Sequence, residues 1–461
     1  MHFQQYYLAC LSHASYLIGD TTTGRAVVVD PQRDVTRYLE DAAAAGLTIE
    51  RVIETHFHAD FLSGHLELRR ATGAAISYGT VGSARTEFAT EPLEDGRRLE
   101  LGRVVLEIRD TPGHTPESIS IVVWERDGDP VPYGVLTGDT LFIGDVGRPD
   151  LLSAFGESAD GLARKLYRSL HERLLTLPDA TRVFPAHGAG SACGKHLSTE
   201  TVSTIGEQRR TNYALAPMSE DEFVRVVTEG QAAAPLYFSF AATRNREARE
   251  AFDEAGSVPT LALESVLAAR DAGAVLLDVR EPADFALAHL RGSVNVGLSG
   301  RFAEYAGEVI RSEQRIVLVG AAPAVAEART RLARIGFDRV DGALVDPEAA
   351  FVARPDEVAV ASRLTAAQVA ERMATVPDLQ VVDVRGPGET ANGTIEGARL
   401  VQLPTLLARA GELDPARPTL VYCAGGYRSS IAASTLRRLG FADVSDLVGG
   451  YGAWAERGVR A

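Results

Sequence analysis

The sequence is poor in sulfur-containing residues and in long apolar runs. It has three cysteines and three methionines among 461 residues, and so few cysteines on a long chain do not make a disulfide framework. Free thiols are typical of a reducing compartment, so we expect a cytoplasmic protein. No stretch of about 18 apolar residues occurs, and no basic segment precedes an apolar one at the N-terminus, so neither a membrane span nor a signal peptide is expected.

Positive charge is also in short supply. The 47 Lys and Arg residues are outnumbered by 62 Asp and Glu residues, which gives a net charge of −15. An acidic surface argues against nucleic acid or an anionic membrane as the main partner, but it allows a local basic pocket. A chain of 461 residues is too long for a single core, and we expect several domains and a homo-oligomer.

The first 190 residues alternate short apolar runs with turn signals. Runs such as RAVVVDP, RVIETH, GVLTGD and RVFPAHG are typical of buried strands, and DVTRYLEDAAAAGL is typical of a helix. This pattern predicts an α/β sandwich. Residues 199–265 are more charged, and we interpret them as a helical extension and linker.

The second half of the chain repeats itself. The segment around LLDVREPADF returns as VVDVRGPGET, with about 105 residues from Asp278 to Asp383. This period suits a duplicated small domain. Each copy alternates strand and helix, which predicts a parallel sheet with flanking helices. We therefore expect an N-terminal domain over 1–245, a first copy over 258–355 and a second copy over 360–461.

Four apolar runs of the N-terminal half end in potential metal ligands. Strand ends at one edge of a sheet converge, and a rigid strand holds a ligand well. His65, by contrast, opens a helical run and is expected on its surface, and His13 is expected to be structural. The strand-end ligands are His56, His58 and Asp60 after the first of these runs, then His114, Asp139 and His187 after the other three.

These motifs, THFHAD, PGHT, TGD and PAHG, resemble those of the metallo-β-lactamase fold, which implies an αββα sandwich for about 1–190. Members similar to glyoxalase II carry His after the Asp and bind two metals. Phe61 stands at that position here, so a single metal is expected. The second half then adds two small parallel-sheet α/β domains.

Two histidines, one carboxylate and open positions describe the facial triad of non-haem Fe(II) oxygenases. The persulfide dioxygenase branch of the fold uses such a triad, and its positions match His56, His114 and Asp139. The resemblance implies one Fe(II) per chain, with His58, Asp60 and His187 nearby. From the residues alone, His58 and His187 are equally plausible ligands.

The segment after Asp139, TLFIGDVGRPDL, is similar to the same branch. Thr137, Arg148 and Asp150 match residues near its persulfide pocket, and Arg148 is expected either to hold an anionic group of the carrier thiol or to pair with a nearby aspartate. Cys193 follows His187 closely in the chain and is expected near the mouth of the site or as an inert buried thiol.

A second chemical centre is expected at VYCAGGYRSS. An apolar strand runs into Cys423, two glycines follow, and a helix then begins. Backbone N–H groups curled around such a loop stabilise an anion, and the cysteine thiolate is the nucleophile. The expected persulfide-binding loop consists of Ala424, Gly425, Gly426, Tyr427, Arg428 and Ser429.

This loop and the upstream VVDVRGPGE resemble the active site of rhodaneses. The first copy has the same opening motif, but its loop reads LVGAAPAVAE. Val319 or Leu318 is expected at the place of Cys423, and Ala324 at that of Arg428. Without a thiol, this copy is expected to be structural or to serve for docking.

The two resemblances together imply a bifunctional enzyme. Iron would oxidise a low-molecular-weight thiol persulfide with O2 to sulfite, and Cys423 would transfer sulfur to sulfite to form thiosulfate, or run the reverse transfer. The alternative is a zinc-dependent thioester hydrolase of the glyoxalase II type, fused to a sulfurtransferase. The carrier thiol is open at this point: glutathione and coenzyme A both fit.

Overall fold

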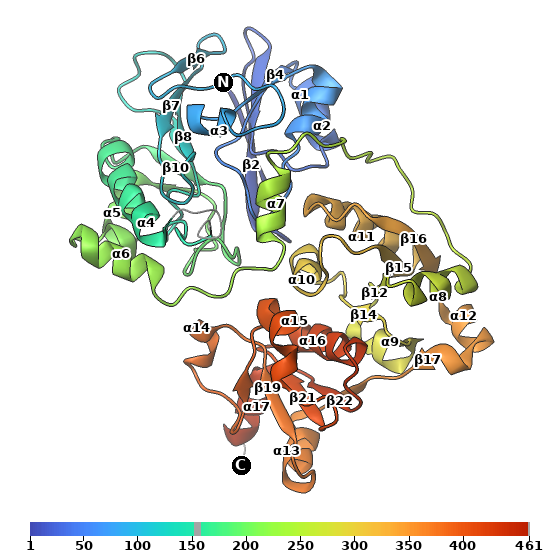
Figure 1. The fold of residues 1–461 in the computed structure, drawn as a ribbon. Coiled ribbons are helices and arrows are strands. Elements are labelled where there is room, and N and C mark those ends of the chain that lie inside the picture. The colour runs from blue at the N-terminus through green and yellow to red at the C-terminus, as the bar shows by residue number, and fades with distance from the viewer. Residues whose placement is uncertain (152–157, 460–461) are drawn as a thin grey trace. The chain divides into compact units, whose positions relative to one another are not determined.

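The computed structural model describes residues 1–151 and 158–459 (Figure 1). The chain forms two compact units. The first comprises Met1–Gln231 and Phe238–Glu254, and the second comprises Ala232–Tyr237 and Ala255–Ala461. None of the described helices is long and apolar enough to cross a membrane.

The first unit contains two mixed sheets. One sheet has the strand order β1-β2-β3-β4-β5, antiparallel as far as β3 and parallel beyond it. Its strands are β1 (His2–Leu8), β2 (His13–Asp20), β3 (Arg25–Val29), β4 (Thr48–Ile53) and β5 (Ala75–Ser77). The other sheet has the order β11-β10-β9-β8-β7-β6. Its strands are β6 (Arg98–Glu100), β7 (Val105–Asp110), β8 (Ile119–Trp124), β9 (Gly134–Gly138), β10 (Arg182–Pro185) and β11 (Ser203–Thr204).

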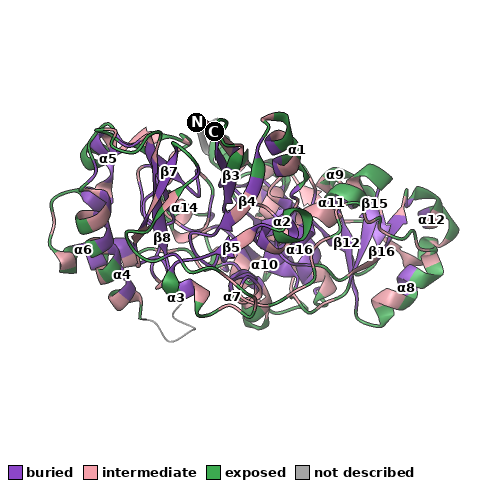
Figure 2. Ribbon diagram, turned by 90° about the horizontal axis from the view of Figure 1, so that it is seen from above, coloured by how far each residue is buried: buried purple, intermediate pink, exposed green. Residues whose placement is uncertain are grey.

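The two sheets pack face to face around one apolar core. Ile18, Val29 and Ile53 of the first sheet share this core with Ile108 and Ile121 of the second. Burial of this apolar surface is the main force that holds the sheets together. Figure 2 shows strands such as β3 and β8, one from each sheet, as largely buried. The expected sandwich is therefore confirmed.

Helices cover the outer faces of both sheets. Tyr38 of α1 and Leu68 of α2 pack on the first sheet, and Leu166 of α4 and Phe223 of α6 pack on the second. This layering gives the order αββα. The helices of the unit are α1 (Thr36–Ala44), α2 (His65–Thr72), α3 (Thr80–Ser83), α4 (Ala159–Arg168), α5 (Ile205–Thr211), α6 (Glu220–Thr228) and α7 (Phe238–Arg244).

The second unit contains two parallel sheets, as the repeat predicts. The first copy has the order β14-β12-β15-β16 and the second the order β18-β22-β21-β19-β20. The strands are β12 (Val275–Asp278), β14 (Val294–Asn295), β15 (Ile316–Gly320), β16 (Val340–Val345), β18 (Ser362–Leu364), β19 (Gln380–Asp383), β20 (Arg399–Leu400), β21 (Thr419–Tyr422) and β22 (Val444–Leu447). A short antiparallel pair, β13 (His289–Leu290) and β17 (Val358–Ala359), lies beside them.

Helices alternate with these strands, which is the expected arrangement for parallel strand connections. In the first copy they are α8 (Leu263–Asp271), α9 (Pro282–Leu287), α10 (Phe302–Val309), α11 (Ala322–Arg334) and α12 (Glu348–Ala353). In the second copy they are α13 (Ala366–Thr375), α14 (Pro387–Thr390), α15 (Leu406–Arg409), α16 (Tyr427–Arg438) and α17 (Gly450–Val459).

The repeated DVR motif has the same structural role in both copies. Arg385 pairs with Asp383 at 2.6 Å and donates to a carbonyl eight residues later, and Arg280 pairs with Asp278 in the same way. A buried charge needs such a partner. The motif therefore holds a strand end to the loop that follows it.

The strand registers correct one predicted correspondence between the copies. Asp278 pairs with Val319 in the first copy, and Asp383 pairs with Tyr422 in the second. Gly320, and neither Val319 nor Leu318, therefore occupies the place of Cys423. The sequence comparison missed this because the loop before the helix is two residues shorter in the first copy. Helix α11 begins two residues after Gly320, whereas α16 begins four residues after Cys423. A glycine also supplies no thiol.

Candidate metal centre and cysteine loop

The predicted metal ligands of the first unit converge at one edge of the sandwich. His56, His58 and Asp60 follow β4, His114 follows β7, and Asp139 directly follows β9. Gly138, at the end of β9, has a positive φ of 50° and would place a Cβ atom 2.8 Å from the Thr55 hydroxyl. Only glycine fits this close approach, which sets Asp139 against the loop that carries His56.

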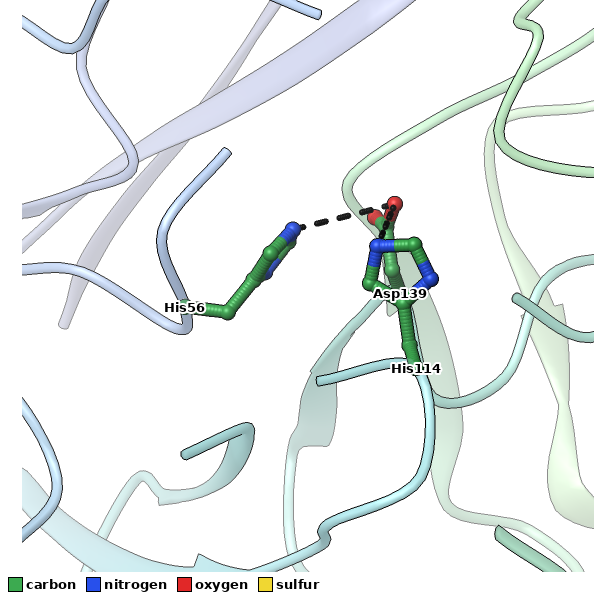
Figure 3. A group of neighbouring side chains, drawn as sticks. All are labelled: His56, His114 and Asp139. Atoms are coloured by element: carbon green, nitrogen blue, oxygen red, sulfur yellow. Dashed lines mark ion pairs between the residues drawn. The ribbon is translucent and has the colours of Figure 1, made fainter. Parts of the chain in front are cut away.

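His56, His114 and Asp139 form one of these groups (Figure 3). The Asp139 Oδ2 atom lies 3.4 Å from His114 Nε2 and 3.8 Å from His56 Nε2. The three side chains are buried, and one ligand atom from each lies within 4.8 Å of the others. This spacing leaves room for a cation between the three atoms.

Hydrogen bonds at Nδ1 turn the Nε2 atoms of the histidines toward Asp139. His114 Nδ1 lies 2.9 Å from the Arg148 carbonyl, and His187 Nδ1 lies 3.1 Å from the Ser12 carbonyl. A carbonyl only accepts, so Nδ1 carries the proton and Nε2 keeps a free lone pair. Both imidazoles are therefore set up as metal ligands.

His56 is oriented by a longer chain of hydrogen bonds. Its Nδ1 atom lies 3.0 Å from the Thr55 hydroxyl, which itself donates to Asp30 at 2.9 Å. The hydroxyl can then only accept from His56, which again leaves the Nε2 lone pair free. Burial, followed by the neighbouring histidines, lowers the pKa of His56 well below its ordinary value, so the ring is neutral, as metal binding requires.

The donor set fits a divalent cation. No N–H or O–H group of the described residues donates a hydrogen bond to either buried oxygen of Asp139. The Cys193 thiol, a weak donor, bonds to Asp139. A buried carboxylate with so little hydrogen bonding is costly, and a bound cation would offset that cost. Two neutral imidazoles and one carboxylate suit iron or zinc. His56, His114 and Asp139 are thus one group that could hold a metal ion.

His58 faces away from this group. Its Nε2 atom lies 3.1 Å from Asp30 and 3.7 Å from Glu54. Burial lowers its pKa, but Asp30 and Glu54 outweigh that effect and raise it to about 9. A protonated imidazole paired with carboxylates is a poor ligand. Between the two alternatives that the sequence leaves open, this geometry favours His187, whose Nε2 lies 3.5 Å from Asp139.

Phe61 lies beside the place where a second metal would need an imidazole. Its ring centroid is 4.3 Å from that of His58 and 4.0 Å from that of His13. His187 Nε2 lies 3.4 Å from Asp60 at the same place. An aromatic ring offers no ligand atom. The candidate ligands on this side are His58, Asp60 and His187, whose ligand atoms lie within 4.8 Å of one another beside a hydrocarbon surface.

Several residues that support the centre carry no sequence signal. Asn245, just beyond α7, is buried and donates to the carbonyls of His58 and Phe61 at 2.8 Å each. The helical extension therefore pins the loop that carries the ligands. The expectation that His65 lies on the helix surface is wrong. The side chain is buried with Nδ1 3.2 Å from a Glu54 carboxylate oxygen, because its side of α2 faces the sheet.

Asp30 provides a first test of the centre. Asp30→Asn should disturb the Thr55 hydroxyl and hence His56, and lower metal affinity by about 10- to 100-fold. A chelator competition titration measures this. Asp20→Asn is the matched control, because Asp20 is also buried and bonded to backbone and hydroxyl groups. Unchanged affinity in Asp30→Asn would refute the role given to Asp30.

The predicted substrate residues lie around the same edge. Arg148 is buried, with Nε and Nη2 each 2.7 Å from Asp150 oxygens, so the guanidinium pairs with Asp150. The Thr137 hydroxyl donates to the Leu141 carbonyl at 2.6 Å and shapes the turn after β9.

Cys193 is buried close to the metal ligands. Its sulfur lies within 4.8 Å of ligand atoms of Asp139 and His187. Burial and then the carboxylates of Asp60 and Asp139 raise the pKa of the Cys193 thiol well above its ordinary value. The thiol is therefore protonated at neutral pH, and its sulfur borders the metal centre.

Cys423 lies at the end of β21 in the second unit. Its side chain is 1% exposed, and the Gly426 N–H donates to its sulfur at 3.1 Å. Gly426 has a φ of 98°, a conformation that glycine adopts at little cost. The Ser429 hydroxyl lies 3.6 Å from the sulfur. The loop thus offers donors to a thiolate at the start of helix α16.

Arg428 is held by an acidic partner. Its two Nη atoms lie 2.8 and 2.6 Å from the Glu389 carboxylate. Burial lowers the pKa of Arg428, but Glu389 outweighs it and keeps the pKa raised. The bidentate pair with Glu389 fixes the Arg428 guanidinium in position, so its positive charge stays at the cysteine loop.

The chain is similar to known proteins in both units. The model of the metallo-beta-lactamase superfamily matches residues 8–187, and that of the rhodanese-like domain matches 262–342 and 365–457. The mitochondrial persulfide dioxygenase ETHE1 of Bos taurus is 32% identical over 237 residues, which cover 50% of this chain and 82% of the relative.

Two further relatives extend the comparison. A hydroxyacylglutathione hydrolase of Methylococcus capsulatus is 34% identical over 211 residues, or 44% of this chain and 76% of the relative. A solved metallo-beta-lactamase from Staphylococcus aureus is 31% identical with a TM-score of 0.68, and the match covers 75% of this chain and 98% of that chain. The latter likeness reaches beyond the first unit.

Proposed function

The chain belongs to the metallo-β-lactamase superfamily and carries two rhodanese-like domains, and from this premise we propose that it is a bifunctional enzyme of persulfide metabolism. His56, His114 and Asp139 would hold a metal that supplies the oxidation of a low-molecular-weight thiol persulfide by O2, and Cys423 transfers sulfur. The observation that supports this most is the pairing, on one chain, of a buried two-histidine, one-carboxylate set with a cysteine loop whose Gly426 N–H donates to the sulfur.

The oxidation balances as one persulfide RSSH, one O2 and one water giving the thiol RSH, sulfite and two protons. The outer sulfur loses four electrons and O2 gains them. One Fe(II) per chain, held by His56, His114 and Asp139, would supply this redox chemistry. The chain's own residues turn Nε2 of His56 and His114 toward Asp139 through hydrogen bonds at Nδ1.

The transfer at Cys423 needs no redox partner. The thiolate attacks the outer sulfur of a persulfide, the S–S bond breaks, and the thiol leaves with its proton. The Cys423 persulfide then gives its outer sulfur to sulfite, which forms thiosulfate and restores the thiolate. The Gly426 N–H, at 3.1 Å from the sulfur, stabilises negative charge before and after this step. The reverse transfer uses the same donors.

We assign these roles to three regions of the chain: 1–245 for oxidation, 258–355 without chemistry of its own, and 360–461 for sulfur transfer. Thr137, Arg148, Asp150 and Cys193 are proposed to border the persulfide in the first region. Joining both activities on one chain raises the effective concentration of sulfite for the transfer step.

A zinc-dependent thioester hydrolase is the second candidate. The identity to a hydroxyacylglutathione hydrolase favours it, as does a donor set that zinc also accepts. Phe61 counts against it, because its ring occupies the place where a second metal would need an imidazole.

Metal content and O2 uptake separate the two candidates. We expect purified protein to hold about one iron per chain, and O2 uptake that depends on added persulfide, with sulfite as product. The measurements are elemental analysis and an oxygen electrode with a panel of persulfides. Stoichiometric zinc with thioester hydrolysis and no O2 uptake would favour the hydrolase and rule out our proposal.

A further inference from the structure

Tyr427 of the cysteine loop is seated in the first rhodanese-like domain, within the same compact unit. Its hydroxyl donates a short hydrogen bond to the carbonyl of Gly297. A Cβ atom at Gly300 would lie 2.5 Å from the Tyr427 ring. Tyr305 of α10 meets the same ring edge to face, with centroids 5.6 Å apart. The Tyr427 ring therefore packs against residue 300 so closely that only glycine fits there.

The loop that receives Tyr427 is itself held in place. Arg331 of α11 donates to the Leu298 carbonyl at 2.6 Å, and the Ser299 hydroxyl donates to Glu281 at 3.0 Å. These contacts tie both sides of the 297–300 segment to the body of the first domain. The segment is thus a fixed wall against the Tyr427 ring.

Helix α16 is anchored to the first domain at a second point. The backbone N–H of Asn295, in edge strand β14, donates to the Ser434 hydroxyl at 3.0 Å. The Asn295 side chain in turn donates to the carbonyls of Asp278 and Arg280 at 3.0 and 2.8 Å. The first domain therefore grips α16 both at its first residue, Tyr427, and two turns later.

The position of Tyr427 governs the donor nearest to the catalytic sulfur. Tyr427 directly follows Gly426, whose N–H donates to Cys423 at 3.1 Å. Gly426 is in the left-handed region, and a peptide next to a glycine turns easily because no Cβ atom restricts it. A fixed Tyr427 removes that freedom and keeps the N–H aimed at the sulfur.

We propose that the first rhodanese-like domain, which has Gly320 in place of a cysteine, serves as a clamp that positions the Cys423 loop through Tyr427. The domain is not a spare catalytic unit. Tyr427 is a positioning residue, and Gly300 and Gly297 are the seat that holds it. This inference deepens the proposed sulfur transfer and rests on it for its biological meaning, but its alkylation test does not depend on that activity.

The test changes the seat and the hydroxyl separately. Gly300→Ala adds a methyl group that displaces the ring, and Tyr427→Phe removes the bond to Gly297. Each should slow alkylation of Cys423 by iodoacetamide at pH 7 by about three- to tenfold, which is the worth of one hydrogen bond. Mass spectrometry of the Cys423 peptide separates this thiol from Cys10 and Cys193.

Sulfur transfer from thiosulfate to cyanide gives the second readout. Because the loop geometry changes and no substrate contact is lost, kcat should fall while KM stays within about twofold. Gly411→Ala is the matched control: it makes the same chemical change in the second rhodanese-like domain, where an added Cβ meets nothing within 4 Å. Gly411→Ala should show wild-type values for both the alkylation rate and the sulfur transfer kinetics.

Wild-type alkylation rates in both folded variants would overturn the clamp. Should Gly300→Ala fail to fold, as judged by its melting curve, Tyr427→Phe decides alone, because it removes one oxygen and adds no bulk. If the unchanged protein transfers no sulfur while both variants still slow alkylation, the clamp stands and the proposed sulfurtransferase activity fails.

Discussion

Cys423→Ser should abolish sulfur transfer while persulfide-dependent O2 uptake continues. A serine hydroxyl is scarcely ionised at neutral pH and cannot form a persulfide, so the transfer rate should fall by at least about a thousandfold. The metal ligands belong to a different compact unit, and their contacts remain unchanged. The product of the variant should be sulfite with no thiosulfate, which chromatography of the sulfur oxyanions measures.

Cys10→Ser is the control for this change. Cys10 lies in the turn between β1 and β2 and is partly exposed, and neither proposed step uses it. It should keep both activities. If Cys423→Ser lost O2 uptake together with sulfur transfer, the division of the chemistry between two centres would be wrong.

Asp139→Asn should abolish metal binding and O2 uptake while sulfur transfer continues. An amide lacks the negative charge that balances a cation between His56 and His114, and its NH2 group would face their Nε2 atoms. We expect the metal content to fall below about a tenth and O2 uptake to fall at least about a hundredfold. Sulfur transfer from thiosulfate to cyanide should stay at its original level.

Asp127→Asn is the control, since Asp127 is an exposed carboxylate of the same unit, paired with Arg98. It should retain metal and activity. Full metal occupancy in Asp139→Asn would show that the cation is held elsewhere, for example by His187 with Asp60. Elemental analysis of the purified variant distinguishes these outcomes before any activity is measured.

Motifs at strand ends are predictable from the sequence because the strand and the turn that position them are formed by residues next to them in the chain. Each candidate ligand follows an apolar run that becomes a strand, and Gly138 before Asp139 marks a place where the chain passes close to Thr55. The cysteine loop is predictable for the same reason: a strand, two glycines and a helix start stand next to one another between Cys423 and Tyr427.

Strands β1 and β2 escaped prediction for a physical reason. Strand β2 is buried along its whole length yet contains His13, Ser15 and Tyr16, so neither apolar alternation nor an apolar run appears. The polar atoms are accommodated by partners distant in the chain: the Tyr16 hydroxyl donates to the Pro185 carbonyl, and Ser15 bonds to Tyr38. Such partners become visible only when the sheets pack.

The sequence alone determined which chemistry this protein can carry, because the identities of ligands and nucleophile are written in short motifs and in Phe61. The strand registers placed Gly320 where the second copy has Cys423. Tertiary structure alone decided how those groups are set. His58 turns to Asp30, and Asn245 pins the ligand loop from the end of the first unit. Tyr427 lies in a seat made by another domain. Each depends on contacts between residues far apart in the chain, and local patterning contains no trace of them.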